Sequence, residues 1–150
     1  MRMEEAGPAA VSAALLSMSA VTDVVGDRIF NLPYLPERIA RPACFHYSEP
    51  GGPGYVRTVS SRGKPHELGL RHVVIFTCEG YSSDPVAEAA DAVLAAFCGD
   101  LPRVGGYRVT AEQLEPWPQI LGSGGVLENG KPYREVGDFY QLNIYRIGGN

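Results

Sequence analysis

Cysteine and basic residues are both scarce in this chain of 150 residues. Its 3 cysteines are an odd number at the wide spacings of Cys44, Cys78 and Cys98, which argues against a secreted fold held together by disulfides. It carries 13 Lys and Arg against 17 Asp and Glu, a net charge of −4, whereas a nucleic-acid coat needs cations to neutralise phosphates. We therefore expect a protein of the reducing cytoplasm that does not coat nucleic acid.

The chain also lacks a long hydrophobic run. The stretch 6–22 is uncharged, but Gly, Pro, Ser and Thr interrupt it, and a membrane span needs about 20 mostly apolar residues. A signal peptide begins with a positive segment, and here Glu4 and Glu5 outnumber Arg2. We predict neither a membrane span nor a secretory signal.

Apolar residues and chain-breaking residues are both abundant. Hydrophobic residues make up 45% of the sequence, and a chain of this length buries roughly 68–70% of its unfolded surface, so a core can form without metal or disulfides. The 18 Gly and 12 Pro favour short strands joined by loops over a helical bundle. The length is typical of one domain, which we place at 1–150, with residues 1–7 as a flexible N-terminus.

Hydrophobic spacing predicts two helices. Apolar residues between 11 and 18 recur at helical spacing after Pro8, which suits a first turn. The second predicted helix covers 84–98, where apolar residues again keep a period of 3.6 and Gly99 ends the pattern. A short further turn is expected at 22–25.

Runs of β-branched and aromatic residues bounded by Gly and Pro predict about five strands. Both faces of the clearest of them, 70–79, are apolar enough to be covered. Few strand pairs are separated by a helix, so we expect an α+β domain whose mostly antiparallel sheet is packed by the two helices. The predicted strands are 43–47, 55–61, 70–79, 107–114 and 137–147.

Four side chains are of the types that bind metals, although their spacing favours a place in the core. Cys44 and His46 lie two apart on one predicted strand, and His72 and Cys78 share a face of another. Neighbouring strands would bring these Cys and His side chains together. However, the chain has no CxxC or HxxxH pair and no GxSxG turn of a serine hydrolase, and cysteine is among the residues most often buried. We predict no catalytic residue, no metal and no cofactor.

The loop after the second predicted strand is the most cationic stretch of an otherwise acidic chain. Its cations and those of the flanking strands are Arg57, Arg62, Lys64 and Arg71, with His66 among them. Such a stretch suits an acidic protein surface or a passage used by DNA, and it is equally typical of a solvated loop. Trp117, between two prolines, either binds a partner or holds its loop to the core. The candidate protein-interface residues are Tyr55, Arg57, Arg62, Lys64, His66 and Trp117.

The order of these segments resembles the tail-completion, or tail-terminator, proteins of long-tailed bacteriophages. Val25-Gly26-Asp27-Arg28-Ile29-Phe30, followed by Arg41-Pro42-Ala43-Cys44-Phe45-His46-Tyr47, is similar to the opening pattern G-x-R-I-[YF]…P-A-h-x-Y of that family. The strand and aromatic turn of 73–81, the helix at 84–98 and the closing strand at 137–145 continue the likeness, which covers roughly 11–147.

The resemblance implies a structural virion protein that is not an enzyme. Members of the family form a ring, typically a hexamer, that caps the tail tube and joins it to the head connector, with DNA passing through. The implied partners are therefore further copies of the chain, the tail tube protein and the head–tail connector protein, with no sequence-specific DNA binding and no membrane. The implied location is the head-proximal end of the tail, after assembly in the host cytoplasm.

Two alternatives to a tail terminator stay open. One is another head–tail connector or adaptor component. The other is a small cytoplasmic metal- or ligand-binding domain or enzyme that uses Cys44, His46, His72 and Cys78.

Overall fold

The structure is a computed structural model that describes residues 1–49, 57–59, 65–80, 84–116, 125–127 and 129–147, with only the backbone of 57–59, 65 and 66. Its helices are α1 (Met3–Ser17), α2 (Ser19–Val25) and α3 (Asp84–Ala96). Its strands are β1 (Ile29–Asn31), β2 (Ala43–Ser48), β3 (Arg57–Val59), β4 (Pro65–Glu79), β5 (Gly99–Asp100), β6 (Tyr107–Pro116) and β7 (Tyr133–Arg146).

The described strands form one sheet in the order β1-β2-β4-β7-β6-β5, with β3 beside the first part of β4. Only β1 and β2 pair in parallel, and the other pairings are antiparallel. This confirms the predicted α+β class and the mostly antiparallel sheet. The sheet has two strands more than expected because β1 and β5 span only three and two residues, too few for an alternating pattern to be recognised.

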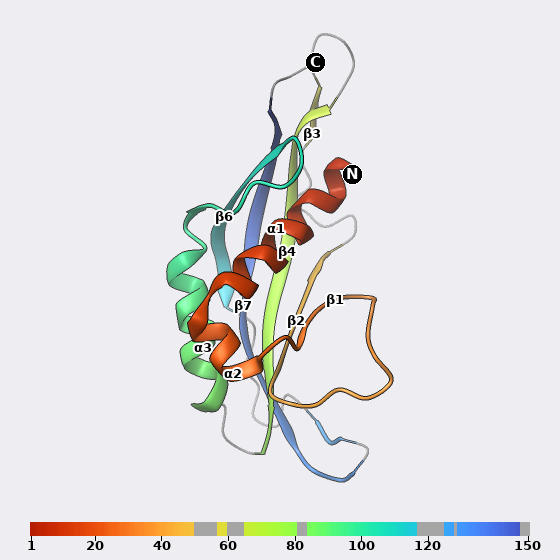
Figure 1. The fold of residues 1–150 in the computed structure, drawn as a ribbon, viewed down its shortest axis with the longest axis vertical. Helices are drawn as coiled ribbons and strands as arrows, with labels where there is room; N and C mark the ends of the chain where they lie inside the picture. Colours follow the sequence, from red (N-terminus) through yellow and green to blue (C-terminus); the bar gives the residue numbers. More distant parts are fainter. Residues whose placement is uncertain (50–56, 60–64, 81–83, 117–124, 128, 148–150) are drawn as a thin grey trace.

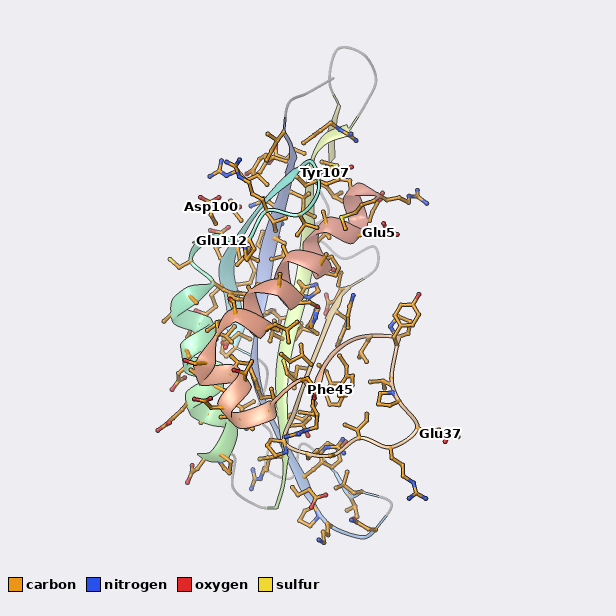
Figure 2. All side chains as sticks on the ribbon, in the orientation of Figure 1. Glu5, Glu37, Phe45, Asp100, Tyr107 and Glu112 are labelled. Carbon is orange, nitrogen blue, oxygen red and sulfur yellow. The ribbon has the colours of Figure 1, made fainter. Side chains whose placement is uncertain are left out.

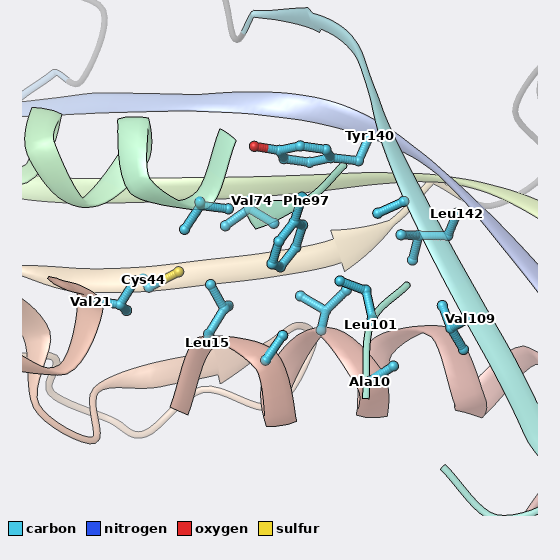
Figure 3. Close-up of a cluster of buried hydrophobic side chains, with 14 of the residues drawn as sticks. Ala10, Leu15, Val21, Cys44, Val74, Phe97, Leu101, Val109, Tyr140 and Leu142 are labelled. Atoms are coloured by element: carbon cyan, nitrogen blue, oxygen red, sulfur yellow. The ribbon is translucent and has the colours of Figure 1, made fainter. Parts of the chain in front are cut away.

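The three helices form a layer over one face of the sheet (Figure 1). α1 contacts β2, β4, β6 and β7, while α3 packs on β4 and β7 with α2 beside it. The main core fills the space between this layer and the sheet, where Leu15 and Val21 of the helices face Val74, Tyr140 and Leu142 of the strands (Figure 3). The predicted helix at 84–98 is therefore present as α3, and it packs on the sheet as expected.

Strand β4 is buried on both faces, as its sequence predicts. Val74 and Phe76 point toward the helices and belong to the main core, while Val73 and Ile75 point away and form a second cluster with Phe139. All five side chains are at most 7% exposed. A central strand between two packed faces explains the near-continuous apolar run in this part of the sequence.

Helix α1 begins at Met3, so the prediction that residues 1–7 form a flexible N-terminus is wrong for residues 3–7. Met3, Ala6 and Gly7 are buried, and a Cβ on Gly7 would lie 3.0 Å from Ile144 Cδ1. Small residues give little hydrophobic signal, so the periodicity of the sequence becomes visible only from residue 11. In the fold their small size lets the first turns of α1 approach the sheet closely.

The proline-rich segment 32–42 connects β1 to β2 and is held at its far end by two arginines. Arg28 Nε donates to the carbonyl oxygen of Pro42 at 2.8 Å. Arg41 Nε donates to Thr77 Oγ1 on β4, also at 2.8 Å. The segment therefore returns to the sheet at a fixed point, although its prolines exclude regular structure.

Candidate interaction surface

The side chains of the six candidate interface residues are not described by the structure. Tyr55, Arg62, Lys64 and Trp117 lie outside the described residues, and Arg57 and His66 are described by their backbone alone, in β3 and near the start of β4. The backbone still gives their position along the sheet. β3 and the first part of β4 project beyond the N-terminal end of α1 (Figure 1), so Arg57 and His66 belong to a part of the sheet that α1 does not cover.

Charge is unevenly divided between the helices and the rest of the chain. The three described helices contain six acidic residues and no Lys or Arg. Asp23, Glu88 and Asp91 are among the exposed ones, and Glu5 extends outward from the N-terminal end of α1 (Figure 2). The charged side chains of the helical layer are therefore all acidic, while the cations among the described residues lie on strands, loops and the N-terminus.

A pocket of about 600 Å³ opens beside the N-terminal end of α1. We call it the α1 pocket. Its walls come from the first two turns of α1 and from the ends of β1 and β2, and Leu70 of β4 also lines it. Pro8 and Leu32 add apolar surface, and Glu4, Glu5 and Glu49 are its carboxylates; none of the described residues that line it is basic. The pocket thus combines apolar side chains with three carboxylates, which we call its rim.

Each carboxylate of the α1 pocket has an arginine partner nearby. Arg2 Nε lies 3.7 Å from Glu4 Oε2, and the Arg2 backbone N–H donates to Glu5 Oε2 at 2.8 Å. Arg71 Nε lies 3.1 Å from Glu49 Oε2. Acidic residues in a first helical turn also offset the helix dipole. A carboxylate has two oxygens that can each accept more than one hydrogen bond, so the rim retains capacity for a further donor.

Arg71 links the rim of the pocket to the face of the sheet that the helices leave open. Its guanidinium forms a second ion pair with Glu115 of β6 and lies over the Phe139 ring, 4.4 Å from its centroid. One partly buried arginine thereby joins β2, β4, β6 and β7. This role is structural, and it accounts for Arg71 separately from the cationic stretch with which we grouped it from the sequence.

Four side chains are linked by hydrogen bonds from Ser12 of α1 to Ser48 of β2. We call them the Ser–His chain. Ser12 Oγ lies 2.8 Å from His46 Nε2, His46 Nδ1 lies 2.9 Å from His72 Nε2, and Ser48 Oγ lies 2.7 Å from His72 Nδ1. A neutral imidazole donates from one nitrogen and accepts at the other, so the chain runs in one direction from serine to serine. Ser48 also lines the α1 pocket.

His46 and His72, the two histidines of the Ser–His chain, are neutral. Each is fully buried; burial lowers the pKa of His46 to about 4, and burial together with the neighbouring His46 lowers the pKa of His72 well below its usual range. Removing a charge from water costs free energy, which disfavours the protonated ring. The chain therefore holds α1 to β2 and β4 through neutral hydrogen bonds.

The four side chains considered for a metal site come together only in part. β2 and β4 are neighbours, and they bring His46 against His72. Burial raises the pKa of the Cys44 thiol and of the Cys78 thiol, which disfavours the thiolate that a metal requires. Within the described residues no group of three or more Cys, His, Asp or Glu could hold a metal ion.

One part of the Ser–His chain is visible in the sequence. Ser48 follows His46 by two residues, so the two side chains share a face of β2. Ser12 lies beside Val11 on the predicted helix. What the sequence does not show is that α1 crosses β2 and β4 at this point, and that depends on the packing of the whole domain.

No single described helix has the length and apolarity that a membrane span requires. Helices α1 and α2 would reach them only together, and they meet at a bend of 84°.

No family model and no curated protein matches the sequence. Among solved structures, the fold is similar to a chain from the virion of a native gene transfer agent (GTA) particle. The TM-score is 0.66, and the match covers 94% of this chain and 96% of that chain at 17% sequence identity. The chain shares the fold of that virion chain. Because the likeness spans nearly all of both chains, it concerns the complete arrangement of sheet and helices.

Proposed function

We propose that this chain is a tail terminator: a structural subunit that forms a ring, caps the tail tube and joins it to the head connector. The observation that carries the proposal is the shared fold with a virion chain over 94% of the sequence. The ordered sequence pattern from 25–30 to 137–145 adds the narrower assignment. The virion likeness supports a structural component, and the pattern supports the place at the head-proximal end of the tail.

The described surface suits contacts between unlike patches of identical subunits. The α1 pocket is acidic and concave, whereas the end of the sheet formed by β3 and β4 projects and continues into a cationic sequence. When two different patches of the same subunit contact each other, the assembly repeats head to tail and closes into a ring if the rotation allows it. Closure at six subunits is the expectation from the family.

The proposed passage of DNA follows from charge. A helical layer with six acidic residues and no Lys or Arg offers phosphates no counter-charge, so it would not hold a passing duplex by the electrostatic attraction that dominates non-specific binding. Sequence-specific readout would need side chains presented to base edges, and the proposed role requires none.

Purified chain mixed with tubes of the tail tube protein from the same genome tests the proposal. Native mass spectrometry should give a closed ring of identical subunits, and electron microscopy should show that ring at one end of each tube. A chain that stays monomeric and ignores tube ends would contradict the proposal. Binding to the portal-side adaptor instead of the tube would assign the chain to the other connector class, which fits the virion fold equally well.

A further inference from the structure

We propose that the α1 pocket is the docking site for residues 60–64 of a second copy of this chain. The inference rests on the proposed function, because it names the contact by which neighbouring subunits of the ring hold each other. It is argued from the chemistry of the pocket, the charge of the segment and the position of the segment along β4.

The pocket has the composition that binds a long basic side chain. Pro8, Leu32 and Leu70 provide apolar surface for an aliphatic stem, and Glu4, Glu5 and Glu49 stand around it as acceptors. Arg and Lys side chains bury their methylene groups against apolar surface while keeping the charged end near polar groups. A volume of about 600 Å³ is within the range of sites that bind compact ligands, so it has room for more than one side chain.

The chain itself contains the complementary segment. Between Glu49 and Glu67 the sequence has no acidic residue, and it includes Arg57, Arg62 and Lys64. The remainder of the chain is acidic, since the whole has a net charge of −4. Opposite charges steer two surfaces together and fix their register. A second copy therefore offers the pocket a segment of complementary charge, in addition to the arginine partners that its carboxylates have within their own subunit.

The geometry of β4 separates the segment from the pocket of its own subunit. β4 is a continuous strand from Pro65 to Glu79, and Leu70 is the residue of β4 that lines the pocket. Five residues of extended strand span about 17 Å, so Pro65, where β4 begins, lies about that far from Leu70. In Figure 1 this end of the sheet projects past the start of α1. From this position of the start of β4 we infer that residues 60–64 contact a neighbouring subunit, and a contact between unlike patches can close a ring.

The hydrogen-bonded serine and histidine chain connects this docking site to α1. Ser48 lies at the pocket and is bonded to His72, and the chain ends at Ser12 of α1. A cationic side chain that donates to Ser48 Oγ uses one acceptor site of that oxygen and polarises its O–H bond, which favours donation from the Ser48 hydroxyl to His72 Nδ1. The proton of His72 is then on Nε2, and that of His46 is on its own Nε2. Docking is expected to select this one direction of the chain.

A peptide titration tests the pocket without requiring ring formation. The host is the full chain carrying Arg62→Glu and Lys64→Glu, so that its own copies do not fill the pocket. The probe is a synthetic peptide of residues 55–66, followed by NMR of the labelled host. We expect saturable shift changes at the amides of Leu32, Ser48 and Leu70, and ring-nitrogen shifts that report the Nε2–H form of both histidines.

Charge variants of the host then separate recognition from non-specific attraction. Glu4→Lys in the host should weaken peptide binding at least tenfold, and a peptide carrying Arg62→Glu and Lys64→Glu should recover binding to that host. The matched control is Glu88→Lys, an equal charge change on exposed α3, which should leave binding within twofold. Should Glu4→Lys fail to fold, Ala9→Trp fills the pocket instead, with exposed Ala13→Trp as its control.

Three results would overturn the inference: no shift changes at the pocket, equal weakening by Glu4→Lys and Glu88→Lys, or rings that form equally well with and without Arg62→Glu and Lys64→Glu. The last result would leave the proposed function intact. Conversely, a chain whose pocket binds the peptide but which never forms a ring at tube ends would retain the docking site and lose the tail-terminator role.

Discussion

His46 and His72 show how a single pair of residues can make the stability of a fold depend on pH. Each ring nitrogen has a partner in the chain from Ser12 to Ser48, and no water is needed to satisfy them. The arrangement is stable because both rings are neutral. Two protonated rings would place two N–H groups against each other at the His46–His72 contact, with no acceptor between them.

We expect the free energy of unfolding to fall as the pH drops below about 6.5. The unfolded histidines bind protons near that pH, whereas the folded His46 binds one only near pH 4 because of burial. Stability is therefore full above about pH 6.5 and is lost progressively toward pH 4. The His46 contribution to that loss is about 3 kcal/mol. Chemical denaturation measured at a series of pH values gives the curve.

Glu135 and Asp138 act in the opposite sense, because burial raises the pKa of both carboxyls. Their protonated forms are favoured in the fold, which offsets part of the loss of stability at low pH.

NMR titration of the histidine rings measures the protonation of His46 and His72 separately from that of the carboxyls. The rings of His46 and His72 should stay neutral at pH 5, in the chain and in the control His66→Gln. A midpoint near 6.5 for either ring would contradict the prediction.

Tyr140 also carries a buried polar group, and the removal of that group is expected to change the stability of the fold. Its hydroxyl is buried and has no hydrogen-bond partner among the described residues, while its ring packs 5.1 Å from that of Phe97. We expect Tyr140→Phe to raise the free energy of unfolding by about 1 kcal/mol, since an unpaired buried hydroxyl is removed and the ring is kept. Thermal and denaturant unfolding measure the change. Tyr145→Phe on the opposite face is the control, and a destabilised Tyr140→Phe would show that the hydroxyl is bonded.

The pairing of β4 with β7 depends on one close approach between elements. A Cβ on Gly137 would lie 2.0 Å from the Val74 carbonyl oxygen and 2.9 Å from Ile75 Cα. These are backbone atoms of the central strand, which cannot move without breaking the ladder that joins the two strands. Position 137 therefore requires glycine because there is no room for a Cβ atom, and not because of its backbone dihedral angles.

We expect Gly137→Ala to lower the free energy of unfolding by about 3 kcal/mol or more, at the upper end of what overpacking costs. Its control is Gly106→Ala, where a new Cβ meets no atom within 4 Å; that variant should unfold within about 0.5 kcal/mol of the parent. Circular dichroism during denaturant unfolding compares the two. Equal stability of both variants would mean that β7 can shift away from β4.

At the same scale, the elements with a long apolar pattern were those that the sequence predicted most clearly. The alternation around Val73 and Val74 gave β4, and the period of 3.6 between Val86 and Phe97 gave α3. β1 and β5 were missed because two or three residues carry no pattern. The start of α1 was missed because its buried contacts come from Ala6 and Gly7, whose importance lies in how closely they let the helix approach.

For the whole molecule, part of the candidate site could be predicted from the sequence, but the way its parts come together could not. The residues His46 and His72 were recognised as close if their strands were neighbours, and β2 and β4 are neighbours. Their hydrogen-bond partners and the α1 pocket depend on where α1 crosses the sheet, which no local pattern determines. The predicted interface roles of Arg62, Lys64 and Trp117 stay predictions, because these residues lie outside the described part of the chain.

The uneven distribution of charge is also a property of the whole molecule. Every described helix contains acidic residues and none contains Lys or Arg, while the cations are placed on strands and loops. A net charge of −4 therefore understates how strongly the two parts differ. In the proposed ring, this difference in charge would favour one relative orientation of neighbouring copies, and so an ordered assembly over random association.

The loop between β1 and β2 presents two exposed large apolar side chains, and one of them, Tyr34, is the most exposed of this kind among the described residues. Tyr34 is 81% and Leu35 49% exposed, and they lie between Pro33 and Pro36, which restrict the backbone. Because Arg41 ties the end of the loop to β4, the two side chains are held away from the body at little entropic cost. Rigid aromatic and apolar anchors of this kind contribute most to protein interfaces.

We expect Tyr34→Ser with Leu35→Ser to weaken ring formation or tube binding at least tenfold while leaving the free energy of unfolding within about 0.5 kcal/mol of the parent, since neither side chain supports the core. The matched control is Leu16→Ser, which removes a side chain that is 53% exposed on α1 and away from this loop. Native mass spectrometry and tube pelleting measure assembly, and denaturant unfolding measures stability. Unfolding of the Tyr34 and Leu35 variant would show that the loop packs on the body, and unchanged assembly would remove it from the interface.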